Sequence, residues 1–218
     1  TGLAALSGGL RVLRGEYKTA AGFGTTAALL FIPIGGVSLI QSRFGATPMG
    51  FQEPIVLLTA VHFHFAGFAL PLMASMAGIF QTGQPRLWRT AHAVCMALLV
   101  GGMPLLAAGF VLSAAALKLA AAVVLATGVV LLCMLVLSLL PEIQNVRARL
   151  LLGFSAVCGA AAMILACVYA AGEFSGTELI TIPQMAATHG LVNGLGFVLC
   201  GMLGWKFLAT NGGEGSQK

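Results

Sequence analysis

Six long runs of apolar residues dominate this chain and restrict it to one class of fold. Each is as long as the roughly 20 apolar residues that an α-helix needs to cross the hydrocarbon core of a bilayer. The runs are continuous and rich in Leu, Ala and Gly, whereas the strands of a membrane β-barrel alternate apolar and polar residues. The sequence therefore predicts an all-α, polytopic membrane helix bundle. Its six transmembrane helices are expected at approximately 20–41, 55–80, 90–112, 116–140, 150–172 and 184–209.

Composition leads to the same class. The 218 residues are 59% hydrophobic and only 8% charged, whereas a soluble domain carries about 25% charged residues. We therefore expect a protein integral to the lipid bilayer, with a single helical-bundle domain over 1–209. The small, polar tail 210–218 is expected to be disordered. Because the chain begins at Thr1 without an initiator Met, a seventh helix encoded further upstream is an open alternative.

The distribution of Lys and Arg predicts an orientation, because these residues concentrate in cytoplasmic loops. With six helices and both termini on the cytoplasmic side, only Arg43 and Lys118 lie outside. The other nine cations all lie inside: Arg11, Arg14, Lys18, Arg86, Arg89, Arg147, Arg149, Lys206 and Lys218. The membrane topology therefore explains the formal net charge of +5, and no nucleic-acid partner is expected.

Three of the four histidines lie well inside predicted membrane spans. His62 and His64 belong to LTAVHFHFAGFALPL, and His189 belongs to MAATHGLVNGLGF. An ionisable side chain is costly in hydrocarbon, so an intramembrane histidine is a functional-site hypothesis by default. In the predicted topology His62 lies roughly 12 Å, and His189 roughly 9 Å, inside the outer end of its helix, at 1.5 Å per residue. We therefore predict a shared buried site in the outer half of the bundle.

Helical spacing adds detail to this site. Residues two apart lie about 200° apart around a helix, so His62 and His64 point in different directions, and spacing leaves open which one faces the site. His189 and Asn193, four apart, share a face. The GxxxG that begins at Gly190 is expected to allow a close helix contact.

Further residues are expected around the histidines. Glu53, at the mouth of the second span, is a candidate proton partner. His92, at the opposite end of the bundle, is interpreted as interfacial. The candidate substrate-binding residues are Thr59, Phe68, Tyr169 and Thr188, although a tyrosine near a helix end also suits an interface anchor. A purely structural role, in which the polar side chains form hydrogen bonds between helices, remains an alternative for each histidine.

Two segments of the chain resemble one known family. HFHFAGF (His62 to Phe68) and THGLVNGLGF (Thr188 to Phe197) are similar to the HFHYAGF-type and THGxxNxxGF-type segments of the YndJ-like bacterial membrane proteins. Phe65 stands where that pattern often has Tyr, which removes a hydroxyl proton donor. The resemblance implies a protein of the bacterial cytoplasmic membrane and supports a site of three histidines and an asparagine, but it implies no reaction.

The favoured functional hypothesis is an enzyme that acts on a lipophilic small molecule by isomerisation, cyclisation, or opening or hydrolysis of an epoxide. Histidine suits acid–base catalysis because its ordinary pKa lies near neutrality. His64 and His189 are the predicted acid and base. Asn193 would orient them, and His62 or Glu53 would support them.

Two other function classes remain open. The first is a histidine-ligated metal or haem protein, because imidazole binds zinc, copper and iron, although HExxH and comparable ligand spacings are absent from the sequence. The second is a proton-coupled transporter, because intramembrane histidines can relay protons. We expect no cofactor, and the sequence leaves open whether the chain forms a homo-oligomer.

Overall fold

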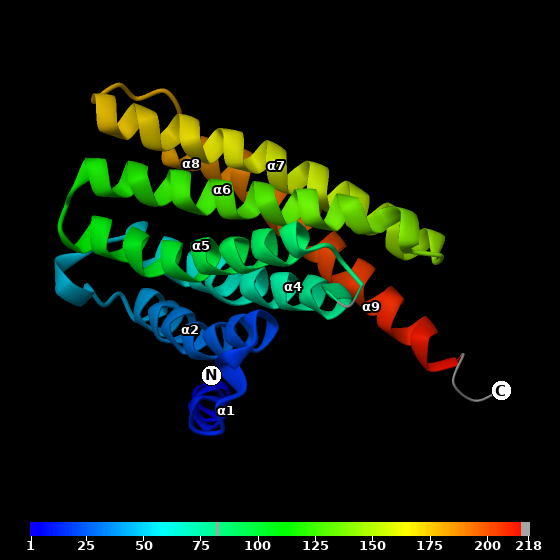
Figure 1. Ribbon diagram of the computed structural model, residues 1–218. Coiled ribbons are helices and arrows are strands. Elements are labelled where there is room, and N and C mark those ends of the chain that lie inside the picture. Colours follow the sequence, from blue (N-terminus) through cyan, green and yellow to red (C-terminus); the bar gives the residue numbers. More distant parts are fainter. Residues whose placement is uncertain (82, 215–218) are drawn as a thin grey trace. The chain divides into compact units, whose positions relative to one another are not determined.

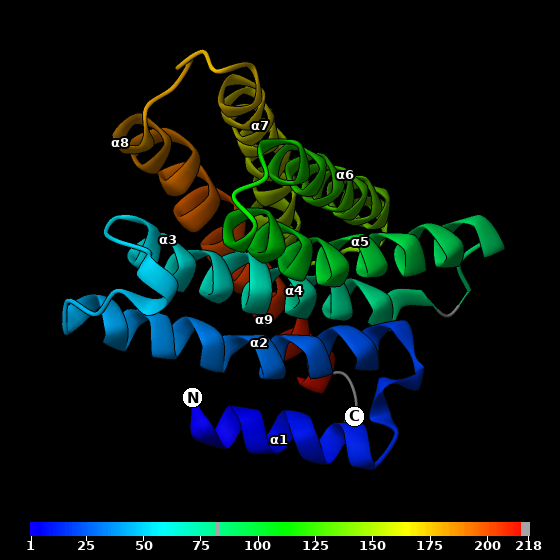
Figure 2. The same cartoon turned by 90° about the vertical axis from the view of Figure 1, so that its left-hand side faces the viewer.

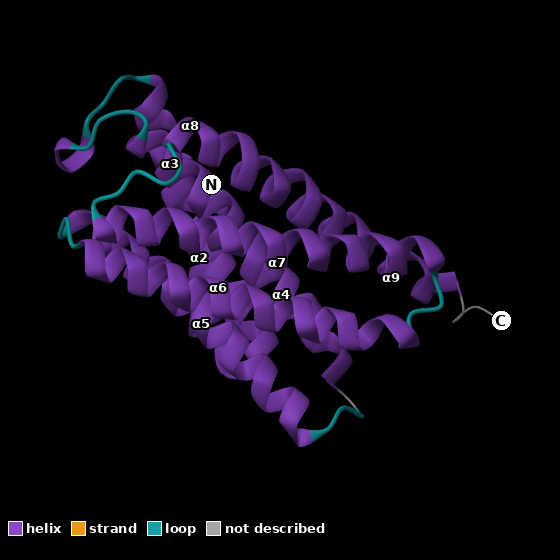
Figure 3. Cartoon of the chain, turned by 90° about the horizontal axis from the view of Figure 1, so that it is seen from above, coloured by secondary structure: helices purple, strands orange, loops and turns teal. Residues whose placement is uncertain are grey.

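The computed structural model describes residues 1–81 and 83–214, and within them all regular secondary structure is helical (Figure 3). The predicted fold class is confirmed, because six of the helical segments are long and apolar enough to cross a membrane. These spans are Ala20–Arg43, Ile55–Phe80, Arg86–Val111, Ala115–Glu142, Val146–Ser175 and Ile182–Ala209. The side of the membrane on which each terminus lies stays a prediction.

The chain divides into two compact units, Thr1–Ile79 (unit 1) and Phe80–Lys218 (unit 2). The single domain that the sequence suggests over 1–209 stays a prediction. The last helix continues to Glu214, so helix extends into the tail that was expected to be disordered from residue 210. Residues 215–218 of that tail lie outside the described part of the chain.

Unit 1 contains two antiparallel helices, α1 (Gly2–Leu13) and α2 (Ala20–Arg43), side by side (Figure 2). Gly8 of α1 lies against Leu30 of α2, and Thr1 lies against Gly36, so the chain begins beside the second half of α2. The second span of unit 1 then packs along α2. It consists of α3 (Ile55–His62), the π-helical segment η3 (Phe63–Ala69) and α4 (Leu70–Ala77). Short 3-10 turns lie at Glu16–Lys18, Pro48–Gly50 and Gly78–Gln81.

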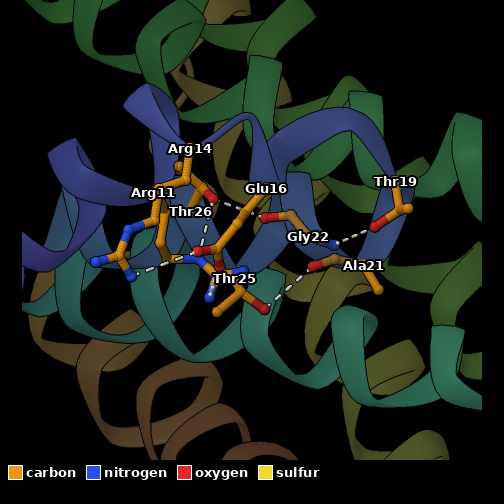
Figure 4. Close-up of polar contacts among 8 residues, drawn as sticks. All are labelled: Arg11, Arg14, Glu16, Thr19, Ala21, Gly22, Thr25 and Thr26. Atoms are coloured by element: carbon orange, nitrogen blue, oxygen red, sulfur yellow. Dashed lines mark hydrogen bonds and ion pairs between the residues drawn. The ribbon is translucent and has the colours of Figure 1, made fainter.

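Polar contacts fix the corner between α1 and α2 (Figure 4). The Arg11 guanidinium donates to Thr26 Oγ1 at 3.2 Å and lies 2.7 Å from a carboxylate oxygen of Glu16. Thr19 caps the start of α2, where its hydroxyl accepts the Gly22 backbone N–H at 3.0 Å. The corner therefore satisfies one otherwise unpaired donor of the first turn of α2.

Unit 2 begins with three successive antiparallel helices (Figure 1). They are α5 (Arg86–Val111), α6 (Ala115–Leu139) and α7 (Val146–Ser175), and α6 packs against both of the others. A tight hairpin joins α5 to α6, as the short gap between the predicted spans 90–112 and 116–140 requires, and in it Ser113 adopts a left-handed backbone (φ 49°). The last span packs on α7 and contains α8 (Ile182–Met185), the π-helical segments η6 (Ala186–Gly190) and η7 (Val192–Leu199), and α9 (Cys200–Glu214).

Polar contacts tie the helices of unit 2 together near both ends of α6. At one end the Lys118 ammonium pairs with the Glu173 carboxylate and lies 4.6 Å from the centre of the Phe110 ring. At the other end Trp88 Nε1–H donates to Ser138 Oγ at 3.1 Å, and its ring stacks on His92. His92, one turn after Trp88 on the packed face of α5, is completely buried within the protein. Its place at the depth of the membrane interface stays a prediction.

Glycines let the last span approach α7 closely. A Cβ on Gly204 would lie 2.8 Å from Leu152 Cγ, and one on Gly196 would lie 2.6 Å from Cys158 Sγ. At Gly190 a Cβ would make only an ordinary contact, 3.7 Å from Met185 O. Close approach to α7 is therefore found at Gly196 and Gly204 rather than at Gly190.

We expect Gly204→Ala to lower the stability of the protein. The added methyl group must displace Leu152, and such overpacking typically costs about 1–3 kcal/mol. Gly101→Ala is the matched control, because a Cβ there meets nothing within 4 Å and alanine favours helix over glycine by up to about 1 kcal/mol. Thermal unfolding in detergent, followed by circular dichroism, measures both. Equal midpoints for the two variants would contradict this packing.

Candidate functional site

Both segments that carry the histidines are π-helical. In η3 the Leu70 backbone N–H donates to Phe65 O, and after η7 the Cys200 N–H donates to Leu195 O, each five residues back. π-Helical turns are rare and occur frequently at functional sites. His64 lies within η3, His62 directly precedes it, His189 lies in η6 and Asn193 in η7. The three histidines and Asn193 therefore lie in, or directly beside, π-helical turns.

In unit 1 each histidine ring is held by its own helix. His62 Nδ1 lies 2.7 Å from Leu58 O, and His64 Nδ1 lies 2.8 Å from Ala60 O. A carbonyl oxygen only accepts hydrogen bonds, so Nδ1 must carry the proton in both rings. In the neutral form of each ring the lone pair is then on Nε2, the atom that can accept a proton or bind a metal.

His64 lies against α2 at a position where only glycine fits. A Cβ on Gly35 would be 2.7 Å from His64 Nδ1 and 3.0 Å from its Cε1. His62 lies two residues earlier, about 200° around an ideal helix from His64. The structure thus places the His64 ring against α2, whereas which of the two histidines faces the predicted site stays a prediction.

In unit 2, His189 and Asn193 form a pair, as their spacing predicted. Asn193 Nδ2 lies 2.9 Å from His189 Nε2 and 3.3 Å from Nδ1, so the amide nitrogen lies close to both nitrogens of the half-buried imidazole. His189 Nδ1 also lies 2.9 Å from the carbonyl oxygen of Ala162 on α7. Since that oxygen can only accept, Nδ1–H donates to Ala162 and Nε2 accepts from the asparagine.

This arrangement is compatible with two protonation states of His189. In the neutral ring Nε2 accepts from the Asn193 amide nitrogen. If Nε2 gains a proton, the same amide turned by 180° presents its oxygen as the acceptor, because both ends of an amide form hydrogen bonds. Nδ1–H keeps its bond to Ala162 throughout. Neither state leaves a polar ring atom unpaired, which would be costly in hydrocarbon.

The packing of α7 supports this pair from a neighbouring turn. The Ser155 hydroxyl, which is buried, donates to the carbonyl oxygen of Phe197 in η7 at 2.6 Å. Ser155 and Ala162 are both on α7, seven residues apart, so one helix fixes the π-helical span at two levels. Neither was predicted: Ala162 acts through its backbone, which leaves no pattern in a sequence, and Ser155 is an isolated serine in an apolar run.

The other predicted residues lie in one unit or the other. In unit 1 the Glu53 carboxylate is exposed and accepts the Leu57 backbone N–H at 3.2 Å. Thr59 donates to Ile55 O at 2.9 Å, and Phe68 is half-buried in η3. In its own span, Glu53 therefore contacts the backbone at the first turn of α3, nine residues before His62.

In unit 2, Thr188 is exposed and donates to Gln184 O at 2.7 Å. Tyr169 is half-buried on α7, one turn before Glu173. The structure brings His189 and Asn193 together, whereas the shared site of all three histidines stays a prediction. Within the described ranges 1–81 and 83–214, no three His, Cys, Asp or Glu side chains gather in a metal-binding arrangement.

The chain is similar to one protein family and to one individual protein. A family model described as YndJ-like protein matches residues 1–197. The chain is also 26% identical, over 178 residues, to a Bacillus subtilis (strain 168) protein named "Uncharacterized membrane protein YndJ". That match covers 82% of this chain and 31% of the relative, so the chain spans about a third of that protein's length.

No solved structure matches the chain significantly. The family model spans every candidate residue, from Glu53 to Asn193. The resemblance seen in HFHFAGF and THGLVNGLGF is therefore confirmed over most of the chain. The protein is an integral membrane protein that belongs to the YndJ-like family.

Proposed function

We propose that this protein is a membrane-embedded enzyme that performs histidine-based acid–base chemistry on a lipophilic small molecule. The observation that carries the proposal is the arrangement of His189 between Asn193 and the Ala162 carbonyl. It supports proton transfer because both protonation states of the ring find hydrogen-bond partners. The reactions that need only proton transfer are isomerisation, cyclisation and the opening of an epoxide by water or an internal hydroxyl.

In this proposal His189 exchanges the proton at Nε2. As a base it removes a proton from the substrate, and as an imidazolium it returns one to the developing oxyanion or carbanion. Asn193 holds the ring and stabilises its charged form through the amide dipole. His64 is the proposed partner acid or base, with His62 and Glu53 in support; that these unit 1 residues serve the same reaction stays a prediction.

A second candidate is supported by the ring tautomers in unit 1. With Nδ1–H bound to backbone carbonyls, His62 and His64 each present Nε2, a common ligand atom for transition metals or haem. A backbone bond to the other ring nitrogen is the usual way in which proteins orient such ligands. Proton-coupled transport is the third candidate, because a ring that tolerates two protonation states also suits a proton relay.

The first prediction from this proposal concerns which ring nitrogen of each histidine carries the proton. Nitrogen-15 NMR of the detergent-solubilised protein, labelled at histidine, should find His62, His64 and His189 protonated on Nδ1 at a pH where the rings are neutral. Asn193→Ala should change the Nε2 resonance of His189, because Nε2 loses its donor, and should leave those of His62 and His64 unchanged. A neutral His189 protonated on Nε2 would contradict the bond to Ala162.

The second prediction separates the proposed enzyme from a metal or haem protein. Metal analysis and an absorption spectrum of the purified protein should reveal no stoichiometric metal and no Soret band. A metal or haem that is present in the wild type and lost in His64→Ala/His189→Ala would replace the acid–base proposal with the second candidate. The unfolding midpoint of the double variant serves as the control for folding.

The third prediction concerns turnover, measured by screening lipophilic epoxides and isomerisable alkenes with the reconstituted protein. His189→Gln should lower turnover by at least about a hundredfold, the usual contribution of a positioned acid or base. Asn193→Ala should lower it less, because the ring keeps its bond to Ala162. Thr127→Val is the control, since Thr127 is exposed on α6 and bonds only to its own helix, at Val123 O. Full turnover by His189→Gln would refute the assignment.

A further inference from the structure

One face of α1 is a stripe of exposed leucines. They recur at a 3-4-3 spacing, which places them on the same side of the helix. The members of this leucine stripe are Leu3, Leu6, Leu10 and Leu13, and their exposed fractions are 84%, 61%, 41% and 84%. Another face of α1 packs on α2, where Gly8 meets Leu30. The leucine stripe is therefore a surface that α2 does not cover.

Two basic side chains, Arg14 and Lys18, lie where the leucine stripe ends. We call them the basic pair. They flank Gly15, whose left-handed backbone (φ 69°) turns the chain from α1 toward α2. The Lys18 ammonium nitrogen folds back to 3.5 Å from the position of a Cβ on Gly15, so both cations lie around one turn.

The basic pair is only partly neutralised. Glu16 is the one acidic residue between residues 11 and 18, and its carboxylate lies 2.7 Å from Arg11 but 4.0 Å from Arg14. The Arg14 side chain is 70% exposed. Among the described residues, no carboxylate lies within ion-pair distance of Lys18. Three cations and one anion leave a charge of about +2 at this corner, chiefly on Arg14 and Lys18.

The direction of this surface matches that of a lipid. From Leu3 to Leu13 the stripe runs roughly 15 Å along α1, at 1.5 Å per residue. The stripe follows the direction of an acyl chain, because α1 lies antiparallel to the membrane-spanning α2 (Figure 2). The basic pair then lies at headgroup level.

We infer that the leucine stripe and the basic pair bind an anionic phospholipid such as phosphatidylglycerol. One acyl chain lies along the stripe, and the phosphate is bound by the Arg14 guanidinium and the Lys18 ammonium. An arginine can donate two parallel hydrogen bonds to phosphate, and a lysine adds a point charge. A 3-4-3 stripe also suits a second helix, but the uncompensated charge at its end favours an anion over an apolar helix face.

The test is native mass spectrometry of the full chain, titrated with phosphatidylglycerol and with phosphatidylcholine at low ionic strength. The wild type should prefer phosphatidylglycerol. Each basic residue near an anionic headgroup contributes about fivefold in affinity, by roughly 1 kcal/mol, so Arg14→Gln/Lys18→Gln should lose about thirtyfold of that preference. Arg147→Gln/Arg149→Gln is the matched control, because it removes the same charge from exposed residues of α7 and should keep the preference.

A second variant tests the stripe. Leu6→Ala/Leu10→Ala should weaken the binding of both lipids, because it removes apolar surface and leaves the basic pair intact. The inference is overturned if the Arg14→Gln/Lys18→Gln variant keeps its preference, or if the control loses as much. It is also overturned if Leu6→Ala/Leu10→Ala leaves lipid binding unchanged but dissociates an oligomer, since the stripe would then be a contact between copies of the chain.

Discussion

Hydrocarbon offers no hydrogen bonds, so each polar group inside a membrane span needs a partner within the protein. This constraint accounts for the all-helical backbone, and it also governs the histidines. Each of the three rings directs Nδ1–H to a backbone carbonyl oxygen, either in its own helix or, for His189, on α7. The same bonds that satisfy the rings also fix which nitrogen carries the proton, and thereby which atom is left for chemistry.

Close packing makes these bonds geometrically feasible. His64 fits beside α2 because Gly35 has no side chain, and the last span approaches α7 through Gly196 and Gly204. With helices this close, a serine or a backbone carbonyl of one helix reaches the next, as Ser155 and Ala162 do. Small residues therefore do more than pack helices in this protein: they bring the polar groups of α7 within reach of a π-helical span.

The two surfaces proposed here meet the membrane in different ways. The His189–Asn193 pair of unit 2 is half-buried, which suits the proposed reaction because the site is partly shielded from water. The corner of unit 1 is exposed and carries net positive charge, which suits the headgroup level of a leaflet. An enzyme with a lipophilic substrate also benefits from ordered lipid around it, because such a substrate reaches the protein from the bilayer.

Much of the fold could be predicted from the sequence, because each helix that spans a lipid bilayer must be long and apolar. Apolar length alone located all six spans, and the short hairpin at Ser113 followed from the small gap between two of them. Other features were beyond this reasoning. The complete burial of His92 is one of them, because it depends on stacking with Trp88 and on the packed face of α5. The helical turns to Glu214 were missed because a small, polar composition is also typical of disorder.

The features of the candidate site likewise fall into those that the sequence predicts and those that only the tertiary structure decides. The sequence by itself determined that the histidines lie inside the membrane and that His189 and Asn193 share a helix face, because both conclusions depend only on hydropathy and helical period. Only the tertiary structure decided that His64 lies against α2, that Ala162 fixes the His189 ring and that both segments are π-helical. These features depend on contacts between helices and on backbone carbonyls, which every residue has and which therefore leave no mark in a sequence.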